Sequence, residues 1–139
     1  MLQGFGLEFH HFGLATRDAE KTLTFLRGLG YSTPRSVHDP VQRVNLVLCE
    51  HPVMPAVEVI SATEEAGPLD LVLAQQPQSI YHLCFRSPDL AASLAAMRAA
   101  GHRTMVVSRP KPAVLFHYRP VSFHMVRGFG LIEIIEDVA

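Results

Sequence analysis

The most constraining feature of the sequence is an internal repeat in which each copy begins on a histidine. The stretch that starts at His11 recurs 71 positions later from His82. Identical pairs at this offset include His11/His82, Asp18/Asp89, Leu23/Leu94, Arg27/Arg98, Gly30/Gly101 and Thr33/Thr104. Two copies of one unit would bring their first histidines together about a pseudo-twofold axis. A symmetric pair of imidazoles would supply two of the four ligands of a typical metal site.

The first copy predicts a β-α-β-β-β module over residues 8–61. An aromatic-rich strand over 8–15 precedes a helix that Thr16 or Asp18 caps and Gly30 ends, with leucines at helical spacing between them. Apolar runs predict three further strands at 30–37, 43–49 and 56–61.

The second copy predicts the same order over residues 80–137, after a polar linker over 62–79 that holds a short helical turn near 68–74. We expect a strand at 80–86, then Ser87 as N-cap, Pro88 in the first turn and a helix to about residue 100. Strands are expected at 103–107, 120–126 and 130–136, with a loop or extra extended segment over 113–120. The whole chain, residues 1–139, is thus expected to form a single domain.

Strand alternation predicts which side chains share a face of the sheet. Tyr81, Leu83 and Phe85 suit packing under a helix, so His82, Cys84 and Arg86 point the other way. Each module also ends in an apolar strand that one carboxylate interrupts, Glu58 in the first and Glu133 in the second. A glutamate among β-branched residues is costly to bury unless it is paired or ligated.

These four residues predict a mixed nitrogen and oxygen ligand set for one divalent ion. Such a set of His11, Glu58, His82 and Glu133 suits Zn, Co, Ni, Mn or Fe(II) and can leave coordination positions open to substrate. Two carboxylates and one divalent cation would make the site close to neutral.

Composition narrows the functional classes. A formal net charge of −1 gives no electrostatic reason for nucleic-acid binding. No apolar run approaches the roughly 20 residues that span a bilayer, and no signal-peptide pattern begins the chain. We therefore expect a cytoplasmic protein with no membrane partner, in which Cys49 and Cys84 are reduced core residues.

The ordered motifs resemble the vicinal oxygen chelate superfamily, the fold of glyoxalase I, methylmalonyl-CoA epimerase and extradiol dioxygenases. The epimerase branch is the most similar. Its "DH-I-G-I-A-V" opening fits residues 9–16, its "ME-L-L" strand fits 57–60, and its "HH-I-A-F-x-V-D-D-I" phrase fits 81–90. Its "E-P-K" turn resembles residues 109–111, and its closing "V-L-I-E-L" resembles 130–134.

The resemblance implies an α+β fold in which paired βαβββ modules form a cupped, eight-stranded mixed sheet around one metal. It also implies a homodimer and a small-molecule substrate. The sequence departs from the epimerases at residues 123–127, in the longer aromatic segment over 112–120, and in the lack of an acidic residue within 44–47. These departures bear on the substrate and leave the fold and metal set intact.

The function predicted from these features is metal-dependent isomerisation, epimerisation or a related lyase reaction on a small acyl substrate, such as a CoA thioester. A divalent ion stabilises the charge that develops when a C–H next to a carbonyl is deprotonated. In the family a ligating glutamate can loosen and act as base, so Glu133 or Glu58 is the expected catalytic base. Candidate contacts for an anionic substrate group are Arg43, Arg86, Lys111, His117, Arg119 and His124.

Two alternatives remain from the sequence. An Fe(II) ring-cleaving dioxygenase uses two histidines and one carboxylate, so a fourth ligand such as Glu58 argues against it. A binding or resistance protein of the same fold has no turnover, and members of that kind often lack some of the ligands.

Overall fold

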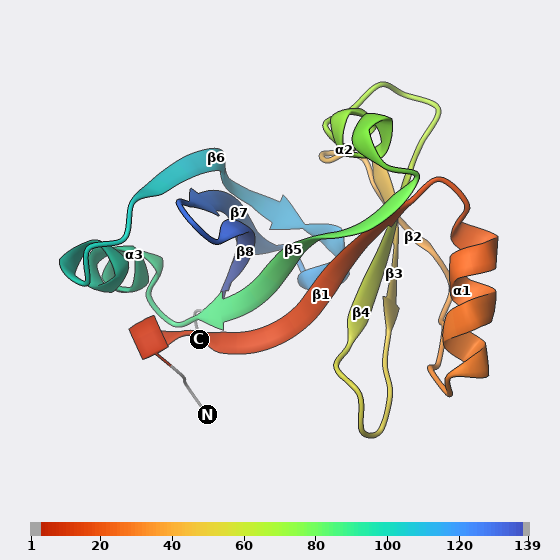
Figure 1. The fold of residues 1–139 in the computed structure, drawn as a ribbon, viewed down its shortest axis with the longest axis horizontal. Helices are drawn as coiled ribbons and strands as arrows, with labels where there is room; N and C mark the ends of the chain where they lie inside the picture. Colours follow the sequence, from red (N-terminus) through yellow and green to blue (C-terminus); the bar gives the residue numbers. More distant parts are fainter. Residues whose placement is uncertain (1–3, 138–139) are drawn as a thin grey trace. The chain divides into compact units, whose positions relative to one another are not determined.

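The computed structural model describes residues 4–137, which divide into two compact units. The His11 unit comprises residues 11–81, and the His82 unit comprises the described residues up to His10 together with those from His82 onward. Eight strands form one mixed sheet in the order β2-β3-β4-β1-β5-β8-β7-β6, and β1 and β5 contribute residues to both units. This architecture, with three α-helices among the described residues, confirms the predicted α+β fold built from two βαβββ modules (Figure 1).

The elements follow one another along the chain as η1 (Gly4–Gly6), β1 (Glu8–Thr16), α1 (Ala19–Gly28), β2 (Val37–Asp39), β3 (Val44–Cys49), β4 (Val57–Ala62), α2 (Leu69–Gln75), β5 (Gln78–Ser87), α3 (Leu90–Ala99), β6 (Thr104–Ala113), η2 (Val114–Phe116), β7 (Arg119–Val126) and β8 (Gly130–Glu136).

In the His11 unit, helix α1 covers one face of the strands. Strand β4 runs parallel to β1 and antiparallel to β3, which is antiparallel to β2. Leu26 of α1 packs with Val47 of β3 and Val59 of β4 in a buried apolar cluster. Because side chains alternate along a strand, Glu58 points away from this cluster.

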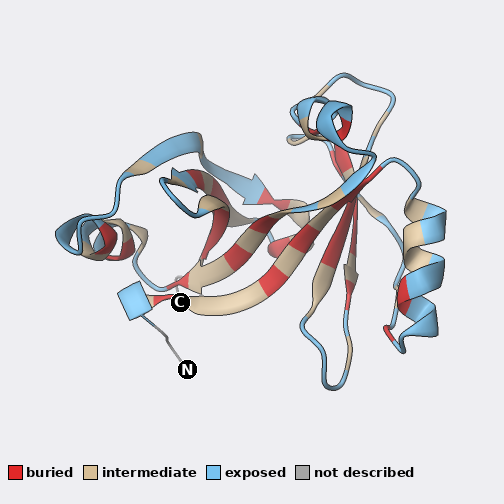
Figure 2. Ribbon diagram, viewed as in Figure 1, coloured by how far each residue is buried: buried red, intermediate tan, exposed pale blue. Residues whose placement is uncertain are grey.

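In the His82 unit, β8 runs parallel to β5 and antiparallel to β7, which pairs with β6. Met97 of α3 packs with Leu7, Ile132 and Ile134, and Phe85 adds to this core. The prediction that Phe85 lies under the helix is therefore confirmed. Figure 2 shows the resulting alternation of buried and half-buried bands along β1 and β5.

The repeat extends to the hydrogen bonds that begin helices α1 and α3. The Asp18 side chain accepts from the backbone N–H of Lys21 at 3.1 Å, and Asp89 accepts from that of Ala92 at 3.0 Å. A hydroxyl two residues earlier accepts in turn from each aspartate's backbone N–H, from Thr16 in one copy and Ser87 in the other. Both helices therefore start with the same capping arrangement.

Both helices also end in the same way. Gly30 and Gly101 adopt left-handed φ angles of 101° and 90°, and the following backbone N–H groups donate to Leu26 O and Met97 O, both at 3.0 Å. This is the Schellman pattern that glycine favours.

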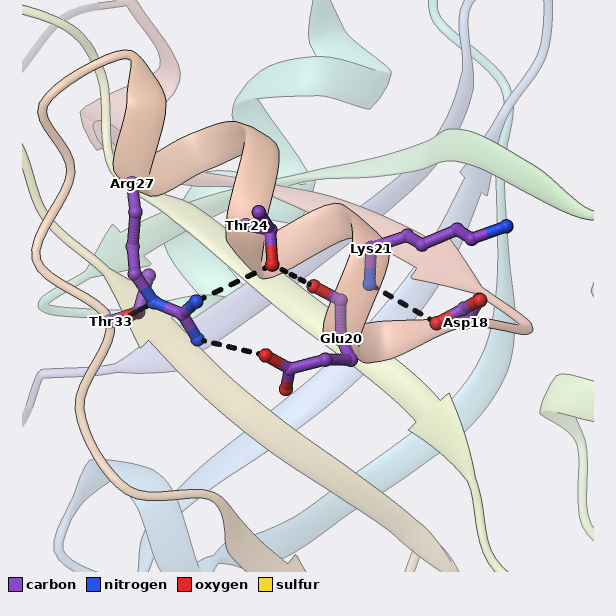
Figure 3. A network of polar contacts seen from close by, with 6 residues as sticks. All are labelled: Asp18, Glu20, Lys21, Thr24, Arg27 and Thr33. Atoms are coloured by element: carbon purple, nitrogen blue, oxygen red, sulfur yellow. Dashed lines mark hydrogen bonds and ion pairs between the residues drawn. The ribbon is translucent and has the colours of Figure 1, made fainter.

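On the outer surface of α1, Arg27 links Glu20, Thr24 and Thr33, as Figure 3 shows.

Three sequence expectations need correction. Asp89, rather than Ser87, caps the second helix, because its carboxylate reaches the first-turn N–H while the Ser87 hydroxyl supports Asp89. The strand expected at 30–37 is reduced to β2, since Pro34 lacks the N–H that strand pairing needs. The strand expected at 103–107 instead continues to Ala113 through two prolines, which an edge strand with register shifts tolerates.

The remaining strands lie within about two residues of their predicted bounds. The expected helical turn near 68–74 is the short helix α2, and the segment 113–120 contains η2. Within residues 4–137, no helix is long and apolar enough to cross a membrane.

Candidate metal centre

The His11 unit holds a buried histidine–glutamate pair on the side of the sheet that faces away from α1. His11 is on β1, and Glu58 is on β4 directly opposite Gly13, two residues beyond His11. His11 is fully buried and Glu58 is 3% exposed. Their Nε2 and Oε1 atoms lie 3.6 Å apart.

The His82 unit holds a second pair with the same strand geometry. His82 is on β5, and Glu133 is on β8 directly opposite Cys84, again two residues beyond the histidine. His82 is 1% exposed, Glu133 is 3% exposed, and their Nε2 and Oε1 atoms are 3.2 Å apart. The Phe123 ring meets His82 edge-on at 5.3 Å between ring centroids, which adds an apolar wall to the pair.

Each pair has the chemistry and spacing of two ligands of one ion. Imidazole nitrogen and carboxylate oxygen bind Zn²⁺ and similar metals at about 2.0–2.2 Å, which places two ligands on one ion about 3.0–3.5 Å apart. The 3.2 Å separation in the His82 unit lies within that range, and the 3.6 Å separation in the His11 unit lies just above it. Buried carboxylates are expensive without a charge partner, so both pairs suit a bound divalent cation.

Three of the predicted substrate-contacting cations share the face that carries His82 and Glu133. Lys111, Val121, Ile135 and Arg86 align across β6, β7, β8 and β5, and Arg119 lies two residues before Val121. Lys111 is exposed, whereas Arg86 and Arg119 are half-buried.

Protein carboxylates already pair with both half-buried arginines. Arg86 Nη2 donates to Glu8 Oε1 at 2.7 Å, and this hydrogen bond is the main reason that the pKa of Glu8 is lowered. Arg119 Nη1 lies 2.9 Å from Asp137 Oδ1, and Arg86 Nε lies 4.0 Å from Asp137 Oδ2. Sequence reasoning missed Glu8 and Asp137, because no local pattern links residues so far apart in the chain.

His124 lies on the opposite face of the same strands. It is paired with Ile132, an α3-facing core residue, whereas its neighbour Phe123 is paired with Glu133. The imidazole is 1% exposed, its Nε2 lies 2.8 Å from Ser122 Oγ, and burial lowers its pKa. The structure therefore does not bring His124 to the side of Glu133.

The two other candidates lie in turns. His117 is exposed and, with Tyr118, adopts a left-handed backbone conformation, which is strained for such side chains. Arg43 belongs to the His11 unit and donates from Nη1 to Ala66 O at 2.7 Å.

A sequence model of the glyoxalase/bleomycin resistance protein/dioxygenase superfamily matches residues 10–123. The chain belongs to this superfamily. No curated protein matches it significantly in a sequence search.

Solved structures with a similar fold include methylmalonyl-CoA epimerases. The enzyme from Mycobacterium tuberculosis matches with a TM-score of 0.78 and 19% identity, over 100% of this chain and 94% of its own. A variant of the Streptomyces coelicolor epimerase in complex with 2-nitronate-propionyl-CoA matches with a TM-score of 0.73 and 19% identity, over 94% and 97%. The hypothetical protein BH1468 from Bacillus halodurans C-125 matches with a TM-score of 0.78 and 18% identity, over 96% of both chains. These likenesses confirm the fold.

Proposed function

We propose that His11, Glu58, His82 and Glu133 together bind one divalent metal ion, and that the protein is a metal-dependent isomerase or epimerase of a small acyl substrate. The observation that carries the proposal is the pair of buried histidine–glutamate contacts with matching strand geometry. One buried histidine–glutamate pair could arise by chance. Its recurrence at equivalent positions of both modules indicates that the two pairs have the same function.

The ligand chemistry favours one shared ion over two separate ones. Two imidazoles and two carboxylates complete a ligand set that neither pair provides alone, with a net charge near zero when a divalent ion is bound.

The proposed reaction is removal of a proton from the carbon next to a carbonyl group. A bound divalent ion would supply positive charge to the substrate oxygen as that proton leaves. One of the two glutamates, Glu133 or Glu58, would accept the proton as general base. Delivery of a proton to the opposite face of the carbon by the other glutamate would give the epimer.

The positively charged row on the His82 face suits an anionic acyl substrate. Lys111 is exposed and is the cation best placed to meet an incoming anion, while Arg86 and Arg119 hold the carboxylates of Glu8 and Asp137. The structures that resemble this chain include an epimerase in complex with methylmalonyl-CoA, which supports an acyl-CoA as substrate class. We also propose that the two modules form one domain, and that the protein is a cytoplasmic homodimer.

Exchange of the substrate α-hydrogen with solvent tests the proposal. Metal-loaded protein in deuterated water, incubated with a panel of 2-substituted acyl-CoAs, should incorporate deuterium into at least one of them, as followed by mass spectrometry. Glu133→Gln should abolish exchange, whereas Glu136→Gln on the same strand should retain it. Oxygen uptake with catechols in place of exchange would favour the dioxygenase alternative, and binding without exchange would favour the resistance-type alternative.

A further inference from the structure

A cavity of about 430 Å³ opens on the helix-facing side of the sheet in the His82 unit. Its lining is mostly apolar and includes Leu7, Met97 and Ile132, each at most 5% exposed. The volume lies within the range of about 300–1,000 Å³ that small-molecule sites occupy.

This cavity is separate from the candidate metal centre. Ile132 faces the cavity, and Glu133, the next residue on β8, points to the other side of the sheet. On β5, Phe85 lines the cavity between Cys84 and Arg86, which share the His82 face. The two faces of the same strands thus present two different chemical environments.

Exposed aromatic side chains flank the opening of the cavity. Phe5 is 39% exposed and Phe129, at the turn between β7 and β8, is 61% exposed. Phe5 has a φ angle of 62°, in the left-handed region, and its ring meets the His102 ring edge-on at 5.7 Å. Backbone strain of this kind concentrates at functional sites, and here it holds an aromatic ring beside an open cavity.

Arg127 gives the rim of the cavity a positive charge. Neither an aspartate nor a glutamate is among the described residues that line it. The backbone N–H of Arg127 donates to Arg103 O at 3.0 Å, so the backbone of a second arginine lies beside that of Arg127. An apolar interior with a cationic rim complements a molecule that has an apolar body and one negative group.

We propose that this cavity binds a small amphipathic carboxylate, with its alkyl chain or ring against Met97 and Ile132 and its anionic group near Arg127. The proposal is independent of the metal centre and of the reaction proposed for it. The occupant is a small molecule rather than a second copy of the chain, because a cationic rim with no acidic partner among the described lining residues is not self-complementary.

Fluorescence titration of the whole chain with 8-anilinonaphthalene-1-sulfonate, an aromatic anion, tests the proposal. We expect saturable binding of one dye per chain, and displacement by decanoate but not by decyltrimethylammonium. Phe129→Ala should weaken dye binding about five- to tenfold, through loss of an apolar wall. Arg127→Gln should weaken it about two- to fivefold, as expected for an exposed charge.

Matched variants in the His11 unit provide the controls. Phe25→Ala removes a phenylalanine that is 69% exposed on α1, and Arg35→Gln removes an exposed arginine. Both should leave dye affinity unchanged. Absence of saturable binding, equal effects of test and control variants, or displacement by the cationic surfactant would overturn the proposal. Dye binding that appears only when a dimer dissociates would also overturn it, since a second copy would then be the occupant.

Discussion

Replacing His124 by alanine should destabilise the protein without removing its metal site. The ring is 1% exposed, packs on the α3 side of the sheet, and lies 2.8 Å from Ser122 Oγ. The variant loses the burial of the ring and leaves a buried serine hydroxyl without this partner. Together these losses should lower the free energy of unfolding by about 2–4 kcal/mol at pH 7.5.

The pH dependence of this effect has a definite sign. Burial holds the pKa of His124 below its ordinary value of about 6.5. As the pH falls below that value, the unfolded chain binds a proton that the folded protein does not. The stability contributed by the neutral, buried imidazole is therefore complete above about pH 6.5 and is lost as the pH falls through the folded pKa. The loss amounts to about 1.36 kcal/mol for each unit by which the pKa in the folded protein lies below that in the unfolded chain.

Urea denaturation of chelator-treated protein between pH 5.5 and 8 measures this difference. The gap in stability between the parent protein and the His124→Ala variant should narrow as the pH falls. His38→Ala, which removes an exposed imidazole, should have nearly the same free energy of unfolding as the parent protein at every pH. A gap that does not change with pH would refute the reasoning, and so would unchanged stability with lost turnover, which would instead restore His124 as a substrate contact.

Three further outcomes follow from the repeat and the core. Asp18→Ala and Asp89→Ala should each cost about 1 kcal/mol in urea denaturation, and the double variant about the sum, because the caps lie in different units; a double variant no worse than either single one would contradict this. Ile134→Ala should cost about 2–5 kcal/mol, since this side chain is fully buried, and a loss below about 1 kcal/mol would show that the core there is not tightly packed. Cys49 is fully buried, and burial raises its pKa to about 11, so a thiol reagent at pH 8 should label it only after denaturation; labelling in the native protein would mean that β3 opens readily.

The duplicated module is the part of the fold that was most predictable from sequence. Regular spacing of apolar residues, the glycines at 30 and 101 and the aspartate at 18 act locally, so they mark helix ends, whereas Ser87 was expected as the second N-cap where Asp89 holds that position. The extent of β6 was not predictable in this way. Its prolines normally break a strand, and only its position at the edge of the sheet makes them acceptable.

Some features of the candidate site were likewise predictable from the sequence, and others were not. Alternation along β5 predicted that His82 and Phe85 face opposite sides, because the two-residue period is a local property. The placement of His124 depends instead on the register between β7 and β8, which pairs it with Ile132. The partners of Arg86 and Arg119 likewise depend on contacts between distant segments, so sequence patterns alone carried no signal for Glu8 or Asp137.

The stoichiometry of metal binding tests the central claim most directly. Purified protein loaded with Zn²⁺, Co²⁺, Ni²⁺ or Mn²⁺ and freed of excess metal should retain one ion per chain, measured by elemental mass spectrometry. Glu58→Gln and Glu133→Gln should each reduce the retained metal to near zero, because both carboxylates would serve the same ion, whereas Glu50→Gln and Glu136→Gln should retain it. Two ions per chain, of which each variant removes only one, or no bound metal in the parent protein, would contradict the account.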